Sequence, residues 1–198
     1  LLLQRKRPEE ALSSFQRIDD LIERMGAITR QLKSYARKGG EAFEPVDIRA
    51  CVSSALSMME PQLRVRSVKI TRAMPRGPVM ILADRIRLEQ VIINLLRNAL
   101  DATKDRSDPQ IDILVTSGET VVMTVRDNGA GITDLENLFE PFYTTKAPGE
   151  GVGLGLAISS GIVNDLGGRL TARNAQSGPG AVFEIQLPIL SEKNQAAE

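Results

Sequence analysis

Residues 127–132 read Asp-Asn-Gly-Ala-Gly-Ile, and they follow the apolar, β-branched run Thr-Val-Val-Met-Thr-Val at 120–125. Such a run predicts a buried strand, which places Asp127 at the strand's end. A carboxylate at this position can accept a hydrogen bond from an exocyclic amine, such as the N6 amine of adenine. Gly129 and Gly131 lack a Cβ, so the backbone can turn sharply and let a flat ring lie close. The stretch therefore indicates a site for a ring that carries an amine.

A second glycine cluster, Gly-Glu-Gly-Val-Gly-Leu-Gly at 149–155, leads into the segment Leu154–Asp165. We expect this segment to be an amphipathic helix whose exposed N-terminal amides would face phosphate oxygens. Between the two clusters, Phe139 and Phe142 bracket Pro141, and both rings are expected to dock on the core as the hinge of a loop. Taken alone, either cluster is more often a turn or a flexible loop.

An upstream helix supplies the third part of the pattern. The segment Asp84–Thr103 is expected to be helical, and the pair Asp108-Pro109 follows as its breaker. Its apolar stripe consists of Leu88, Val91, Ile92, Leu95, Leu96 and Leu100. Asn94 and Asn98 lie four residues apart on one face. Asn98 offers a neutral amide oxygen that suits Mg²⁺, a hard ion that bridges phosphates. With both glycine clusters downstream, the combination indicates an ATP site.

These motifs resemble those of sensor histidine kinases, and they occur in that family's order. The run Glu-Gln-Val-Ile-Ile-Asn-Leu-Leu-Arg-Asn-Ala at 89–99 is similar to the N box of the family. Residues 127–132 are similar to the family's first glycine box, and residues 139–142 to its F box. Residues 151–156 match the second glycine box, and residues 178–188 resemble the closing strand of the same domain. The loop sequence Phe-Tyr-Thr-Thr-Lys and Asn-Ala-Leu-Asp-Ala at 98–102 look most like the dicarboxylate-transport and nitrogen-regulation sensor kinases.

The resemblance implies a fold, a reaction and a set of site residues. The fold is of the α+β class: a two-layer α/β sandwich of the Bergerat type found in gyrase and histidine kinase ATPases, preceded by a long coiled-coil helix. The cofactors are ATP and Mg²⁺, and the γ-phosphate passes to a histidine and then to an aspartate of a response-regulator receiver domain. The residues implied to bind the nucleotide are Asn94, Asn98, Asp101, Asp127, Gly129, Gly131, Ile132, Phe142, Thr144, Thr145, Lys146, Gly151, Val152, Gly153, Leu154 and Gly155.

Three of these residues, Asn94, Asn98 and Lys146, are expected to take part in catalysis, with Asn98 as the metal ligand. Related gyrase-type ATPases carry a water-activating glutamate at the position of Asn94. Without that general base, hydrolysis should be slow and transfer to a protein side chain preferred. Lys146 is the expected partner of the γ-phosphate, but a solvated loop lysine explains it nearly as well, and Lys104 is a weaker candidate. Asp101 stands where many family members carry a phosphate-binding lysine, so the identity of the cation that contacts the phosphate stays open.

Residues 1–42 form a separate unit in this interpretation. A heptad seam predicts a long helix that ends at Gly39-Gly40 and self-associates in a bundle, with packing on its own domain as the alternative. The seam consists of Ala11, Phe15, Ile18, Ile22, Met25, Thr29, Leu32 and Ala36. The segment resembles the second helix of the dimerisation and phosphotransfer hairpin, which implies a homodimer. The sequence contains no histidine, so the phosphoacceptor helix is missing and this sequence alone cannot phosphorylate itself.

The catalytic ATP-binding domain is expected to span residues 43–190, followed by a polar, disordered tail at 191–198. Its strands are predicted at 45–48, 68–73, 79–83, 111–116, 120–125, 169–174 and 181–187, with helices at 49–63, 84–103 and 154–166. Lysine plus arginine and aspartate plus glutamate balance at 25 each, which argues against nucleic acid or anionic lipid as a partner. The single cysteine, Cys51, excludes an internal disulfide, suits the cytoplasm and is expected to be a buried, inert thiol. Zinc is not expected, and membrane contact would come only from N-terminal regions outside this sequence.

Two rival functions fit parts of the pattern. A pure ATP-binding scaffold with a decayed site is disfavoured because each motif keeps its chemically competent residue. An anti-sigma-type serine kinase is disfavoured because such kinases do not need a dimerisation hairpin.

Overall fold

The computed structural model describes residues 43–146 and 151–190, which fall into two parts. The larger part comprises residues 43–143 and 153–190, and it contains every helix and strand of the described chain. The smaller part comprises residues 144–146 and 151–152. The predictions for the heptad helix in 1–42, for the loop at 147–150 and for the tail at 191–198 lie outside the described residues.

The larger part is built on a five-stranded mixed sheet with the strand order β2-β4-β5-β7-β6. The strands are β2 (Lys69–Ala73), β4 (Gln110–Ser117), β5 (Thr120–Asp127), β6 (Arg169–Asn174) and β7 (Ala181–Pro188). Strand β2 runs parallel to β4, and all other neighbours are antiparallel. The predicted hairpin between β4 and β5 is present. A separate two-stranded sheet pairs β1 (Glu44–Asp47) with β3 (Met80–Ala83).

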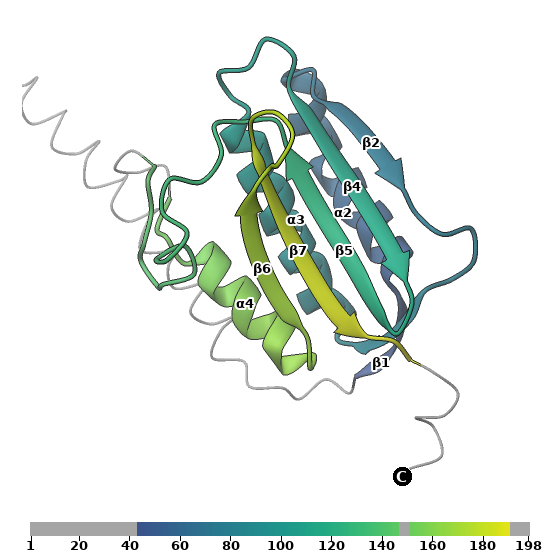
Figure 1. Cartoon of the computed structure of the whole chain (residues 1–198). Helices are drawn as coiled ribbons and strands as arrows, with labels where there is room; N and C mark the ends of the chain where they lie inside the picture. The colour runs from purple at the N-terminus through teal and green to yellow at the C-terminus, as the bar shows by residue number, and fades with distance from the viewer. Residues whose placement is uncertain (1–42, 147–150, 191–198) are drawn as a thin grey trace, which may run out of the picture. The chain divides into compact units, whose positions relative to one another are not determined.

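Three helices cover one face of this sheet: α2 (Ile48–Val65), α3 (Arg85–Ala102) and α4 (Gly155–Asp165), as Figure 1 shows. The strands explain why only one face is covered, because buried residues alternate with half-buried or exposed ones along β4 and β5. The inward residues of these two strands are Ile111, Ile113, Val115, Val121, Met123 and Val125, all buried. They pack against the apolar stripe of α3, every residue of which is buried. The predicted two-layer α+β sandwich is therefore confirmed.

Side-chain caps fix the helix ends close to their predicted positions. The Asp84 carboxylate accepts a hydrogen bond from the Arg87 N–H at 3.1 Å and caps α3. At the other end, the Thr103 hydroxyl donates to the carbonyls of Ala99 and Leu100 at 3.1 and 3.0 Å. The helix thus ends at Ala102, ahead of the Asp108-Pro109 pair that was predicted to break it.

Cys51 lies on the inner face of α2 and is fully buried. Burial raises the pKa of its thiol to about 11, with the nearby Glu89 carboxylate contributing. The thiol therefore stays protonated at neutral pH, as expected for an inert core cysteine. Among the described residues, none of the helices combines the length and the apolar composition that crossing a bilayer requires.

Candidate nucleotide site

Asp127 is the last residue of β5 and only 2% exposed. Its Oδ1 atom accepts hydrogen bonds from two backbone amides, Gly129 at 2.8 Å and Ala181 at 3.3 Å. Ala181 begins β7, the neighbouring strand, so the sheet itself sets the orientation of the carboxylate. The sequence placed Asp127 correctly at the strand's end but did not predict that β7 would hold it.

The second carboxylate oxygen, Oδ2, has no hydrogen-bond partner within residues 43–146 and 151–190. Burial raises the pKa of Asp127, although the Gly129 and Ala181 amides act in the opposite direction. A buried carboxylate oxygen without a donor is costly, and native proteins rarely leave such a group unpaired. The Asp127 geometry thus fits a ligand that brings its own N–H donor, as the exocyclic amine of adenine would.

The turn after Asp127 is shaped by close packing. A Cβ atom at Gly129 would clash with the backbone carbonyl of Ala102, the last residue of α3. Gly131 adopts φ = 82°, a conformation that favours glycine. The next residue, Ile132, is clamped by Asn174, whose side chain accepts from its N–H at 2.7 Å and donates to its C=O at 2.9 Å. Position 129 therefore requires glycine because the end of α3 packs against it, a contact that the sequence did not reveal.

The two asparagines of α3 are both half-buried. Asn94 donates from Nδ2 to the hydroxyl of Ser159 on α4 at 3.0 Å. A Cβ at Gly155 would lie 2.5 Å from the Asn94 Oδ1 atom, so only glycine lets the two helices approach this closely. Asn94 therefore joins α3 to the first turns of α4. Asp101 lies further along the same helix and is also half-buried.

Helix α4 begins at Gly155, with Leu154 as its N-cap residue, and no side chain of the described residues caps its first amides. Leu154 packs into the core and is 6% exposed, so its side chain does not reach toward a ligand. Uncapped N–H groups at a helix N-terminus form an anion-binding arrangement, since the helix dipole favours negative charge there. The structure thus keeps the feature expected of the second glycine cluster, although the helix starts one residue later than predicted.

The F box meets the second glycine box through the backbone. The Phe142 N–H donates to the Gly153 carbonyl at 2.9 Å, and a Cβ at Gly153 would lie 2.5 Å from the Phe142 carbonyl carbon. Phe142 adopts φ = 68° and is 66% exposed, whereas Phe139 is half-buried. The prediction that Phe142 docks on the core is therefore wrong: this left-handed backbone conformation turns the ring outward.

The smaller part holds five of the predicted site residues: Thr144, Thr145, Lys146, Gly151 and Val152. Within it, the Lys146 N–H donates to the Thr144 hydroxyl at 3.2 Å. A Cβ at Gly151 would lie 3.2 Å from Cδ of Lys146, so the lysine stem lies against this glycine. The roles of these residues toward a nucleotide stay predictions.

Asn98 stays a prediction as the metal ligand. No group of three or more histidine, cysteine, aspartate or glutamate side chains that could hold a metal ion occurs within residues 43–146 and 151–190. A single amide oxygen on α3 fits a Mg²⁺ ion that takes its other ligands from phosphates and water.

Three residues of the site were missed by sequence reasoning. Ser159 is 2% exposed and lies in a helix that is otherwise apolar on its inner face, a break in the pattern that could have flagged it. Asn174 ends β6, and an asparagine at a strand end is too common to single out. Ala181 contributes only its backbone amide, for which a sequence carries no signal.

The fold is that of a known family of ATPases. Residues 83–191 match the family of histidine kinase-, DNA gyrase B-, and HSP90-like ATPases. The match covers more than half of the chain, which therefore belongs to this family.

Curated relatives of this chain include sensor proteins, as the sequence motifs predicted. The C4-dicarboxylate transport sensor protein DctB of Pseudomonas aeruginosa is 39% identical over 191 residues, covering 94% of this chain and 31% of the relative. DctB of Rhizobium meliloti is 41% identical over 189 residues, covering 93% and 30%. The chain thus spans about a third of the length of these curated relatives.

Solved structures of histidine kinases share the fold. The nucleotide-free catalytic domain of histidine kinase ThkA has a TM-score of 0.67 and 29% identity, covering 75% of this chain and 96% of that one. ThkA in complex with the response regulator TrrA has a TM-score of 0.73 and 26% identity, covering 95% and 54%. These likenesses confirm the family that the sequence motifs indicated.

Proposed function

We propose that this chain is the ATP-binding catalytic part of a two-component sensor histidine kinase, and that it passes the γ-phosphate of ATP to a histidine outside this sequence. The observation that carries the proposal is Asp127, buried at the end of β5, whose Oδ1 is held by two amides and whose Oδ2 has no donor among the described residues. Adenine offers the N–H donor that this oxygen lacks.

The chemistry follows from what the chain provides and what it omits. The half-buried pair Asn94 and Asn98 supplies amides rather than carboxylates, so α3 offers no general base to activate water at Asn94. This favours phosphoryl transfer to a protein side chain over hydrolysis. We assign Mg²⁺ to Asn98; when bound, the ion neutralises charge on the phosphates. Lys146 is proposed as the cation that contacts the γ-phosphate.

The domain organisation and the partners belong to the same proposal. Residues 43–190 form the catalytic domain, and 1–42 the end of a dimerisation hairpin through which two copies associate. The phosphate then passes to a response-regulator aspartate, in keeping with the ThkA neighbour that was solved with its response regulator. We place the catalytic part in the cytoplasm of a sensor held at the membrane by regions outside this sequence.

The test supplies the missing histidine in trans. The full chain is mixed with a hairpin domain that carries a phosphoacceptor histidine, together with ATP labelled on the γ-phosphate. The proposal predicts label on the hairpin that is acid-labile, as expected for phosphohistidine. The matched control is a hairpin with that histidine replaced by alanine. Acid-stable label would indicate a serine kinase, and nucleotide binding without any transfer would indicate an ATP-binding scaffold.

A further inference from the structure

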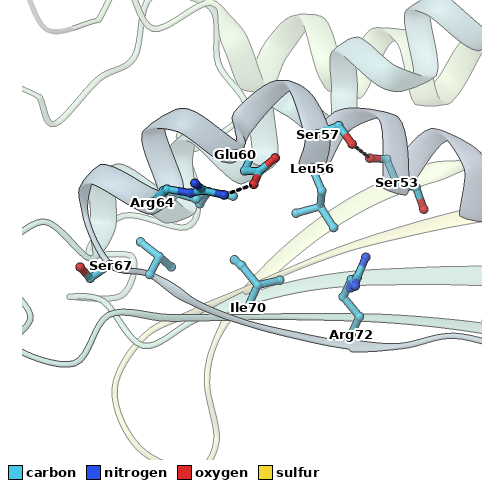
Figure 2. Close-up of a pocket in the computed structure, with 10 residues that line it drawn as sticks. Ser53, Leu56, Ser57, Glu60, Arg64, Ser67, Ile70 and Arg72 are labelled. Atoms are coloured by element: carbon cyan, nitrogen blue, oxygen red, sulfur yellow. Dashed lines mark hydrogen bonds and ion pairs between the residues drawn. The ribbon is translucent and has the colours of Figure 1, made fainter.

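A groove of about 760 Å³ lies between α2 and β2, the edge strand of the five-stranded sheet. Figure 2 shows Leu56 on the helix pointing toward Ile70 on the strand, with Arg72 further along the same strand. Its helix wall also carries Ser57 and the Glu60–Arg64 ion pair. The groove is therefore apolar in the middle and charged at its ends.

The helix-facing side of β2 is only partly buried. In the sheet register, Ile70 pairs with Ile111 and Arg72 with Ile113, so these four side chains point to the same face. Ile111 and Ile113 are buried, whereas Ile70 is half-buried and Arg72 is exposed. Arg72 thus faces the helices but stays exposed, so the helices leave this end of β2 uncovered.

The outer edge of β2 is also open. The Lys69 N–H donates to the Pro109 carbonyl at 2.8 Å, which directs the backbone groups of Lys69 toward β4. Hydrogen-bonding direction alternates along a parallel strand, so the N–H and C=O groups of Ile70 and Arg72 point away from β4. No other described strand pairs with that side of β2. An open row of backbone groups is a ready template for an added strand.

The charge around this edge is mostly positive. Residues 64–76 contain five basic side chains and no acidic one. Within the groove, the Glu60 carboxylate is already paired with Arg64 at 2.6 Å, while Arg72 has no partner among the described residues. Asp112 on β4 pairs in register with Thr71 and therefore lies on the opposite face of the sheet. The groove and its edge thus present a net positive surface.

We propose that the edge of β2 binds an extended, acidic segment of a partner protein by strand addition. The segment's backbone bonds to Ile70 and Arg72, an apolar side chain enters between Leu56 and Ile70, and an acidic side chain lies beside Arg72. A second copy of this chain fits poorly, because pairing two β2 edges would bring Lys69 and Arg72 of both copies together. Like charges opposite one another disfavour such pairing.

The probe is a synthetic peptide of about the length of β2 in which a valine and an aspartate stand two residues apart, with threonine at the other positions, because side chains two apart on a strand share one face. Binding to the full chain is measured by calorimetry, and amide exchange of Ile70 and Arg72 is followed by NMR. Two control peptides accompany it: one with lysine in place of aspartate, and one N-methylated at alternate residues so that it cannot form a strand ladder. We expect saturable binding of the acidic peptide, slower amide exchange at both residues, and at least about tenfold weaker binding of each control.

Two variants localise the effect. Arg72→Glu reverses the exposed charge, and Ile70→Pro removes an N–H that the β4 ladder does not use, a substitution that edge strands tolerate. Each substitution should weaken binding of the acidic peptide by at least about tenfold. Arg169→Glu, on the exposed start of the opposite edge strand β6, is the matched control and should bind the peptide normally. ADP binding reports on the nucleotide site separately and should be retained by all three variants.

Several results would overturn the proposal. They are no peptide binding to a chain that binds ADP, equal binding of the N-methylated peptide, or binding that leaves the exchange of Ile70 and Arg72 unchanged. If the chain dimerises and Ile70→Pro abolishes this dimerisation, the edge of β2 would instead be assigned to a second copy of the chain.

Discussion

Asn94 on α3 donates a hydrogen bond to the buried Ser159 hydroxyl on α4 at 3.0 Å, and this pair links the asparagine helix to the second glycine box. Removing the hydroxyl by Ser159→Ala leaves a half-buried amide N–H without its acceptor. We expect a loss of about 1 kcal/mol in the free energy of unfolding, measured by urea denaturation. Ser160→Ala, one residue along the same helix, is the control and should change stability little. An additive double-mutant cycle with Asn94→Ala would contradict the coupling.

Two glycines can be tested against one that faces open space. Gly155→Ala would place a Cβ 2.5 Å from Asn94 Oδ1, and Gly129→Ala would clash with the Ala102 carbonyl. At Gly118, in the β4–β5 turn, a Cβ meets nothing within 4 Å. Thermal unfolding should show losses of about 1–3 kcal/mol for the first two variants, as overpacking typically costs. Gly118→Ala should unfold at a temperature close to that of the unaltered protein. Equal losses of stability for all three variants would argue against the close contacts at Gly129 and Gly155.

The assignment of the metal to Asn98 predicts a selective defect. Asn98→Ala should weaken the binding of Mg²⁺-ATP far more than the binding of adenosine, because only the former uses the amide oxygen as a metal ligand. Fluorescence titrations with and without Mg²⁺ measure both affinities. Equal losses for the two ligands would mean that Asn98 is only structural.

The pKa of Asp127 predicts a pH dependence of stability. Because burial raises this pKa in the folded state, the folded protein binds the proton more tightly than the unfolded chain. The contribution of Asp127 to stability is therefore complete below the ordinary aspartate pKa and is lost as the pH rises through the raised folded-state value. Relative to Asp127→Asn, the unaltered protein should gain stability as the pH falls through that window, in urea denaturation at several pH values. A difference that falls as the pH falls would show that the fold stabilises the ionised carboxylate instead, and a flat difference would show that folding leaves this pKa unchanged.

Local signals explain why so much of the fold could be predicted. The boundaries of α3 follow from Asp84 and Thr103, whose side chains cap the helix through neighbours in the sequence. The β4–β5 hairpin follows from alternating apolar residues on both sides of a short turn. Such elements depend on contacts between residues close in the chain, which composition and periodicity can express.

The missed features depend on contacts between distant segments. The Ala181 amide reaches Asp127 only because β7 inserts beside β5, and a backbone donor leaves no trace in residue type. The outward ring of Phe142 follows from a left-handed backbone conformation that a phenylalanine rarely adopts. The sequence predicted β2 as a strand, but only the strand order places it at the edge of the sheet.

The central claim is that this chain is an ATP-binding kinase domain whose adenine is held by Asp127. The most direct measurement is calorimetric titration of ADP into the unaltered protein and into Asp127→Asn at neutral pH, with urea denaturation of both. The amide can still accept from Gly129 and Ala181, so the free energy of unfolding should not fall, while the affinity for ADP should drop by about 1–3 kcal/mol. Equal affinity in two folded proteins would contradict the assignment of Asp127 and the nucleotide site built around it.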